Sequence, residues 1–231
     1  LAYAAWMAHA GHEVIVVSPR AAAAADMRLD AVTVAAAGVL DAQVAVRQAA
    51  SLAGLVAACD ILIIAVPLNG HRGVMDQLLP HLRDGQVVIV SSMASLSALY
   101  LYEAAKAQGR AIQVVSLGTT ALTARRTGPL AVRIMTRRTR LGLSCLPTPA
   151  TGDALALAKG LFGDVFFAEP HALASALVNI NPGAHGPLAL FNWTRIERGE
   201  HWPQYRYMTP AVARVIERLD AERLALAQAF G

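Results

Sequence analysis

Residues that form disulfide bonds and metal sites are scarce in this chain. Its 231 residues include only two cysteines, Cys59 and Cys145, and both lie beside apolar segments. Two such cysteines cannot supply a disulfide framework or a four-cysteine zinc site, so free buried thiols in a cytoplasmic protein are expected. The spacing of the histidines does not suggest a metal site either, and no metal is expected.

Long apolar runs and basic stripes are also missing. Hydrophobic residues make up 55% of the chain and the mean hydropathy is +0.44. No segment approaches the ~18 consecutive apolar residues that span a membrane. The net charge of +4 comes almost entirely from arginine, because Lys106 and Lys159 are the only lysines. The arginines are not interleaved with aromatic residues, so neither a membrane nor a nucleic acid is an expected partner.

Apolar strands alternate with helices along much of the chain. Segments 60–66 (DILIIAV) and 86–90 (QVVIV) are apolar on both faces, which is typical of central parallel strands. Other expected strands and helices follow the same rhythm: strands 13–17, 32–34, 44–46 and 111–115, and helices 51–58, 70–82 and 96–108. The helix at 51–58 is expected to begin with a serine cap, Ser51. Because parallel crossovers are right-handed, this α/β alternation predicts a Rossmann-like, doubly wound, mostly parallel sheet.

The rhythm changes after Gly118. Strands at 130–135 and 141–146, separated by an arginine-rich turn, predict a hairpin at the sheet edge. A helix at 151–161 and a short strand at 165–167 follow, and the pattern is helical from Pro170 onward. The sequence therefore predicts a nucleotide-binding domain over residues 1–168 and the start of an all-helical domain over 169–231.

The last helix has clear signals at its start. Thr209 is a suitable N-cap, and Pro210 stands at the first helical position, where its missing N–H costs nothing. Arg218 and Glu222 are spaced to pair on the exposed side. An apolar stripe recurs at helical spacing, at Val212, Val215, Ile216 and Leu219.

The glycine-rich turn that opens a dinucleotide-binding fold is not in the chain. Residues 1–10 are expected to form a helix that stops at Gly11, before the strand at 13–17. In such folds this helix follows the first strand and the phosphate loop. We therefore expect that strand and loop to precede Leu1. A different fold that begins with a helix remains the alternative.

The end of the strand at 13–17 bears on the choice of cofactor. An acidic residue there would bind the ribose 2′-hydroxyl of NAD, but the chain has Ser18 and Arg20. A hydroxyl and a guanidinium suit a 2′-phosphate, so NADP is expected, with NAD left open. A solvated loop position is the alternative for Arg20.

The segment Asn179-Ile180-Asn181-Pro182-Gly183-Ala184-His185-Gly186-Pro187, followed by 188–192 (LALFN) and 196–197 (IE), resembles the start of the catalytic domain of the octopine/opine dehydrogenase family. Tyr205, 209–210 (TP), 215–217 (VIE) and 220–223 (DAER) are similar to the same family's next helix. Segments 60–67, 71–86 and 128–130 with the hairpin after them extend the resemblance backward.

The resemblance implies an NAD(P)-dependent dehydrogenase acting on CH–NH donors. In the family, a histidine of this motif is the general acid/base, and the match places it at His185. Its partner aspartate would lie beyond Gly231. A non-catalytic nucleotide-binding remnant is therefore one alternative. A ketopantoate-reductase-like reductase of 2-oxo acids is another, although the region around Asn181 lacks the lysine expected there.

The residues themselves also suit a site. Pro182, Gly183, Gly186 and Pro187 predict a break between two helices that aims His185 into a cleft. Imidazole titrates near neutral pH and can exchange a proton within one cycle. A histidine that caps a helix is the alternative.

Two amides and a strand end complete the expected site. Asn181 and Asn192 could hold a carboxylate or the nicotinamide, and an N-cap is the alternative for Asn181. Val66, Pro67 and Gly70 would border the cofactor at the carboxyl end of their strand, or form an ordinary turn.

Other polar residues are given no role in the site. His71 and His81 are expected on a helix surface, and Arg125 and Arg126 in an exposed turn.

The expected reaction reduces the imine formed from a 2-oxo acid and an amino acid. NAD(P)H delivers the hydride and His185 manages the proton. The expected partners are these small molecules, and the sequence leaves a homodimer open.

Overall fold

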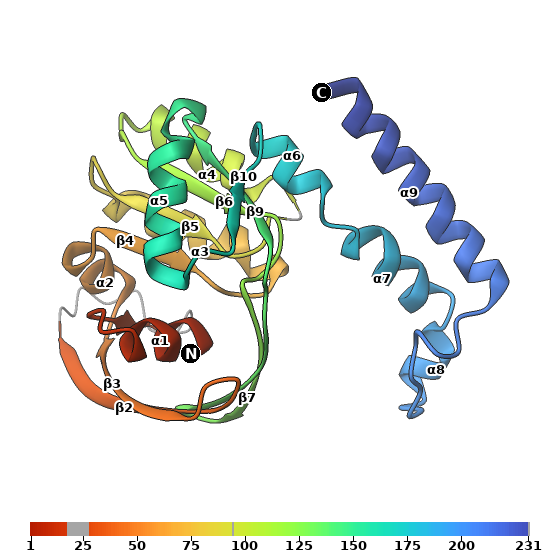
Figure 1. Cartoon of the computed structure of the whole chain (residues 1–231), viewed down its shortest axis with the longest axis horizontal. Helices are drawn as coiled ribbons and strands as arrows, with labels where there is room; N and C mark the ends of the chain where they lie inside the picture. Colours follow the sequence, from red (N-terminus) through yellow and green to blue (C-terminus); the bar gives the residue numbers. More distant parts are fainter. Residues whose placement is uncertain (18–27, 94, 231) are drawn as a thin grey trace. The chain divides into compact units, whose positions relative to one another are not determined.

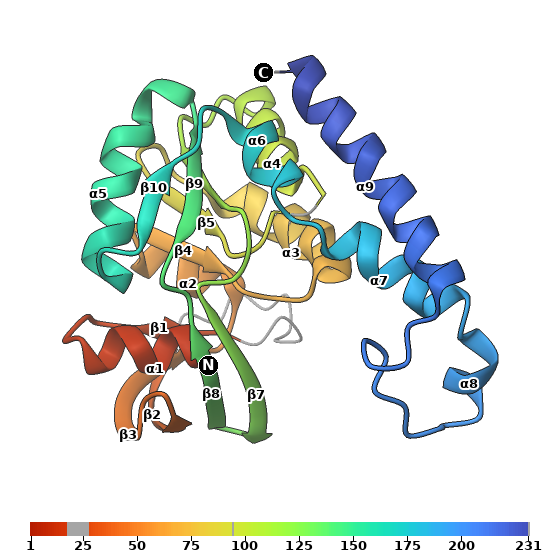
Figure 2. The ribbon, with the colours of Figure 1, turned by 45° about the vertical axis from the view of Figure 1, so that its right-hand side comes forward.

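The computed structural model describes residues 1–17, 28–93 and 95–230. The chain forms two compact units, Leu1–Ser175 and Ala176–Gly231. The first unit is a layered α/β structure, and the second is helical (Figures 1 and 2). No helix within the described ranges is long and apolar enough to cross a membrane.

One sheet of the first unit carries the predicted parallel strands. Its five strands lie in the order β10-β9-β6-β5-β4. Strands β4, β5 and β6 are parallel to one another, β9 runs antiparallel to β6, and β10 is parallel to β9. The bounds are β4 Ile61–Ile64, β5 Val87–Val90, β6 Gln113–Leu117, β9 Leu141–Leu146 and β10 Phe166–Ala168.

Helices cover both faces of this sheet, as a doubly wound fold requires. Figure 2 shows α5 on one side of the sheet and α3 and α4 on the other. The helical bounds of this unit are α1 Ala2–His9, α2 Leu52–Ala58, α3 His71–Leu78, α4 Ser97–Ala107 and α5 Thr151–Phe162, with short 3-10 turns η1 Leu68–Gly70, η2 Leu79–His81 and η3 Thr148–Ala150. The predicted serine cap of α2 is confirmed, since Ser51 Oγ accepts from the N–H of Gly54 at 3.0 Å.

A second sheet holds the remaining strands, in the order β1-β3-β2-β8-β7. The strands expected around 32–34 and 44–46 are confirmed and are longer than predicted, forming an antiparallel pair. The strand expected at 13–17 is shorter. The bounds are β1 Ile15–Val16, β2 Leu29–Gly38, β3 Ala42–Ala49, β7 Leu122–Gly128 and β8 Ala131–Arg137.

The predicted hairpin of residues 130–135 with 141–146 is wrong. Strand β8 pairs with β7 and β2, whereas β9 pairs with β6 and β10 in the other sheet. Burial explains the division. Residues 141–145 are all buried, which suits a strand with neighbours on both sides, while β8 alternates between buried and exposed positions at its start. Residues 138–140 therefore connect the two sheets, and Arg125 and Arg126 lie on β7 rather than in a turn.

The segment 60–66 was predicted to be a central strand, but β4 lies at the edge of the described sheet and pairs only with β5. Leu62 and Ile64 are buried, and Ile61 and Ile63 pack against the main core cluster. Apolar residues on both faces of a strand indicate that other elements cover both faces of the sheet. They do not indicate whether the strand has one neighbouring strand or two.

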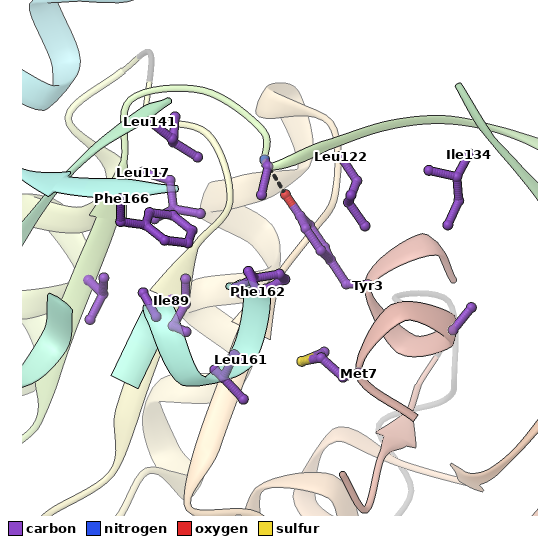
Figure 3. Close-up of a cluster of buried hydrophobic side chains, with 14 of the residues drawn as sticks. Tyr3, Met7, Ile89, Leu117, Leu122, Ile134, Leu141, Leu161, Phe162 and Phe166 are labelled. Carbon is purple, nitrogen blue, oxygen red and sulfur yellow. Dashed lines mark hydrogen bonds between the residues drawn. The ribbon is translucent and has the colours of Figure 1, made fainter. Parts of the chain in front are cut away.

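One buried cluster joins the two sheets to helices α1 and α5. Figure 3 shows Tyr3 and Met7 of α1 beside Phe162 of α5. The rings of Tyr3 and Phe162 meet edge to face with their centroids 5.3 Å apart, a favourable aromatic geometry. Both cysteines are free as expected. Cys145 is buried in this cluster, whereas Cys59 is only half-buried. Burial raises the pKa of its thiol to about 11.

The second unit consists of helices linked by short segments. Helices α7 and α9 pack against each other. The predicted start of α9 is confirmed, because Thr209 Oγ1 lies 3.5 Å from the N–H of Val212 and Pro210 is the first helical residue. Arg218 and Glu222 pair as predicted, at 3.9 Å. The bounds are α6 Ala172–Leu177, which spans the junction of the units, α7 Asn181–Leu190, α8 Trp193–Glu197 and α9 Pro210–Phe230.

The predicted helix break around His185 is wrong, because α7 runs continuously through it. Pro182 lies in the first turn of the helix, where a missing N–H is tolerated. Pro187 lies inside the helix and cannot donate to the carbonyl of Gly183. The residue before it is Gly186, which has no Cβ to collide with the proline ring, so this proline is accommodated in helical backbone.

Candidate active site

The carboxyl ends of the parallel strands form the first candidate site. Strands β4, β5 and β6 end at Ile64, Val90 and Leu117 on the same edge of their sheet. The backbone remains tied together beyond these ends. The N–H of Ser91 donates to Ile64 at 3.0 Å, and the N–H of Met93 donates to Leu117 at 2.9 Å. This is the edge at which open α/β sheets bind their ligands.

Val66, Pro67 and Gly70 form a tight turn just beyond β4. The N–H of Gly70 donates to the carbonyl of Pro67 at 2.8 Å and closes the turn η1. A Cβ added to Gly70 would lie 3.5 Å from Val66 Cγ2, an ordinary contact. Pro67 is exposed. The structure therefore places the three predicted cofactor-lining residues together at the carboxyl edge.

His71 was predicted on a helix surface, and this is wrong, because its side chain is only 3% exposed. Its Nε2 lies 3.2 Å from the carbonyl oxygen of Val66, which can only accept, so Nε2 carries the proton. Its Nδ1 accepts from the hydroxyl of Ser97, 2.9 Å away. Burial lowers the pKa of His71. The imidazole thus ties the loop after β4 to the first turn of α4. His81 is exposed, as predicted.

Tyr3 makes a second link at the same edge, and sequence reasoning did not single it out. Its Oη lies 2.8 Å from Ser91 Oγ and accepts from the N–H of Ala121 at 2.9 Å, the bond drawn in Figure 3. Burial raises the pKa of Tyr3. Ser91 directly follows a buried strand, and this position in the sequence could have identified it as a residue of the carboxyl edge. Tyr3 carries no such signal, because 118 residues separate it from Ala121.

Ser18 and Arg20 lie outside the described residues, so the cofactor choice drawn from them stays a prediction. Among the described residues, no histidine, cysteine or carboxylate side chains gather in a group that could hold a metal ion.

The second candidate site lies on α7 of the helical unit. His185 is exposed, and its Nε2 contacts the hydroxyl of Tyr205 from the segment before α9. The two rings are tilted by 51° and their centroids lie 6.0 Å apart. An exposed imidazole with a defined hydrogen-bond partner can exchange protons with a bound molecule.

The two predicted amides differ in their surroundings. Asn181 is exposed at the first position of α7, so the alternative of an N-cap is wrong, and its N–H donates to Asn179 Oδ1 at 3.0 Å. Asn192 follows α7 and donates its Nδ2 to the carbonyl of Leu188 at 3.0 Å. Asn181 thus keeps an exposed amide, while Asn192 supports the end of its own helix.

Comparison with known proteins shows a resemblance to opine dehydrogenases. Residues 168–231 match the family model described as NAD/NADP octopine/nopaline dehydrogenase, alpha-helical domain. An opine dehydrogenase from Arthrobacter sp. (strain 1C) is 28% identical over 175 residues, which cover 74% of this chain and 48% of that protein. The resemblance to opine dehydrogenases predicted from the sequence is confirmed.

Solved structures show the same fold. A structure of octopine dehydrogenase with NADH and L-arginine has a TM-score of 0.67 and 19% identity, covering 92% of this chain and 57% of that one. A PanE/ApbA family ketopantoate reductase from Ralstonia eutropha JMP134 has a TM-score of 0.65 and 18% identity, covering 99% and 70%. The fold is therefore Rossmann-like, as predicted. The chain spans about half the length of the opine and octopine dehydrogenases that it matches.

Proposed function

We propose that this chain acts in an NAD(P)H-dependent oxidoreductase of the opine dehydrogenase type, which reduces the imine formed from a 2-oxo acid and an amino acid. One observation carries the proposal. A Rossmann-like unit is followed directly by a helical segment, residues 168–231, that matches the alpha-helical domain of octopine/nopaline dehydrogenases and contains His185.

The first unit supplies the proposed cofactor site. The turn of Val66, Pro67 and Gly70, in which Pro67 is exposed, borders the carboxyl edge of the parallel strands, where a dinucleotide would lie. The buried side chains of His71 and Tyr3 hold the neighbouring loops through hydrogen bonds. When bound, the nicotinamide supplies the hydride, and the protein supplies position and electrostatics.

NADP is the proposed cofactor, and NAD is the alternative that the description of the matched family also names. The proposal rests on Ser18 and Arg20, since a guanidinium makes charge-assisted, forked hydrogen bonds to a phosphate. NADPH should therefore be used more efficiently than NADH.

The helical unit supplies the proposed proton-transfer group. The 2-oxo acid and the amine condense with loss of water, and a hydride and a proton then saturate the C=N bond. His185 accepts a proton from the incoming amine and donates one to the departing oxygen. Asn181, with its exposed amide, is proposed to hold a substrate carboxylate, and Asn192 to support the same region. The proposed substrates are small molecules, and a homodimer in the cytoplasm is the proposed setting.

Replacing His185 tests this assignment. In the complete protein, His185→Ala should abolish the oxidation of NADPH that depends on both a 2-oxo acid and an amino acid, while the Kd for NADPH stays unchanged. His201→Ala is the matched control, since His201 is an exposed histidine of the same unit. Turnover by His185→Ala at the rate of the control would remove His185 from the role.

A reductase of free 2-oxo acids is the second candidate, favoured by the match of the ketopantoate reductase fold to 99% of this chain. The two lysines, Lys106 and Lys159, lie before the helical unit, so it offers no lysine for such a site. Oxidation of NADPH with the 2-oxo acid alone, unaffected by added amino acids, would favour this candidate.

A further inference from the structure

One backbone carbonyl of the turn after β4 is bonded to a buried side chain. Pro67 has no N–H, so the peptide unit that joins Val66 to Pro67 carries a single hydrogen-bonding group, the carbonyl oxygen of Val66. His71 is only 3% exposed, and its Nε2 lies 3.2 Å from this oxygen. A buried imidazole therefore holds the one polar group that this peptide unit offers.

This bond bears on the orientation of Pro67. A peptide unit is planar, so a hydrogen bond to the carbonyl of Val66 helps to fix the plane in which the nitrogen of Pro67 lies. The proline ring restricts the next torsion angle of the backbone, and Pro67 has a φ of −56°. The direction in which the exposed ring of Pro67 points therefore depends on the contact between His71 and Val66.

The imidazole is held on its other side by α4. Its Nδ1 lies 2.9 Å from the hydroxyl of Ser97, which is only 7% exposed in the first turn of that helix. The hydroxyl can donate to Nδ1, and the proton of the neutral ring then lies on Nε2, where the oxygen of Val66 accepts it. A chain of two hydrogen bonds, Ser97 to His71 to Val66, thus runs from a buried helix position to the candidate cofactor edge.

We propose that His71 is a positioning residue for the cofactor, and that it acts through the carbonyl of Val66 to hold Pro67 in the place that binding of NADP(H) requires. This inference rests on the proposed function. It goes beyond that function because it makes the affinity for the cofactor depend on a buried residue that does not line the cofactor site.

Two variants at position 71 separate the two bonds of the ring in the complete protein. The amide nitrogen of glutamine has a reach similar to that of Nε2, and the amide nitrogen of asparagine has a reach similar to that of Nδ1. His71→Gln can therefore still donate to Val66, whereas His71→Asn cannot. In a fluorescence titration, the Kd for NADPH should rise roughly fivefold in His71→Asn, the effect of one lost hydrogen bond, and by less than about twofold in His71→Gln. His81→Asn is the matched control, at an exposed histidine in the turn η2 that follows α3. Equal rises of the Kd in the two variants at position 71 would overturn the proposal.

Amide hydrogen exchange tests the positioning without any cofactor. The N–H of Gly70 donates to the carbonyl of Pro67 at 2.8 Å and closes the turn, so its exchange rate reports whether the turn keeps its shape. Exchange at Gly70 should be faster in His71→Asn, with residues outside the turn unaffected, and unchanged in His71→Gln and His81→Asn.

Two results of the exchange measurement would overturn the proposal, whether or not NADPH binds. One is unchanged exchange at Gly70 in His71→Asn, and the other is faster exchange throughout the first unit, which would show a general loss of stability. If exchange is as expected but the unmodified protein binds neither NADPH nor NADH, the proposed function fails, while the hold of His71 on the turn stands.

Discussion

His71 shows how one buried side chain can hold two loops at the candidate cofactor edge. Its two nitrogens bind Ser97 and the carbonyl of Val66, and neither bond needs a positive charge. The hydroxyl of Ser97 can donate to Nδ1 of the neutral ring, and burial, which disfavours the charged ring, lowers the pKa of His71. The neutral ring is therefore part of the folded structure.

The stability of the first unit should fall in acid because of this histidine. The pKa of His71 in the folded protein lies below the ordinary value of 6.5, so below pH 6.5 the unfolded chain binds a proton that the folded chain does not. The stability that neutral His71 contributes to the folded protein is fully present above pH 6.5. It declines as the pH falls from 6.5 through the pKa of His71 in the folded protein. We expect the urea midpoint to drop between pH 7.5 and 5.5, and the drop to be smaller in His71→Gln. His81→Gln, at an exposed position, should retain the full drop. If the two variants have the same pH dependence, His71 is not the group responsible.

The helices α2 and α4 differ in whether a side chain caps their first turn. Ser51 caps α2 and is 1% exposed, with its Oγ bonded to the N–H of Gly54. The start of α4 has no side-chain cap, and its N-cap position is Leu96 at a φ of 56°. Ser95 also precedes a helix in the sequence, but it is exposed and does not cap it.

The two serines should therefore differ in their effect on stability. Ser51→Ala removes a capping oxygen and should lower the free energy of unfolding by about 1 kcal/mol. Ser95→Ala should change it by less than about 0.5 kcal/mol, as is usual for an exposed position away from such a contact. Urea denaturation followed by circular dichroism measures both values. Equal effects in the two variants would contradict the assigned cap.

At the scale of the whole molecule, cofactor binding and proton transfer are proposed to reside in different units. The turn at Pro67 belongs to the first unit and His185 to the second. A change in one unit should then affect one function without the other.

A carboxylate at Pro67 should weaken cofactor binding. Pro67 is exposed beside the carboxyl edge, so Pro67→Glu would repel the phosphates of the dinucleotide and raise the Kd for NADPH roughly tenfold, about 1.4 kcal/mol. Pro80→Glu is the matched control, an exposed proline in the 3-10 turn η2. Binding is followed by the fluorescence of NADPH in a titration. A Kd that rises as much in the control as in Pro67→Glu would argue against cofactor binding at this turn.

Sequence patterns predicted structural features correctly where the interacting residues are close together in the chain. The serine cap of α2, the threonine cap and first-turn proline of α9, and the Arg218–Glu222 pair each involve residues within four positions of one another. Errors occurred where partners are distant. The hairpin after Gly118 was assigned to the wrong strands, and His71 was assigned to the surface, because strand neighbours and burial depend on residues far along the chain.

The candidate site shows the same division. The motif around His185 identified the residue, but its four prolines and glycines suggested a broken helix, because the accommodation of Pro187 depends on the backbone built around it. Tyr205 belonged to the resemblance, yet its contact with His185 could not be read from their separation of 20 residues.

The sequence by itself determined the α/β alternation, the family resemblance and the identity of the candidate imidazole, because periodicity and motifs are properties of neighbouring residues. Only the tertiary structure decided which strands share a sheet, which histidine is buried and which phenol meets His185. Those contacts form when segments remote in the chain pack together, and hydrophobic burial sets that packing without leaving a local signature.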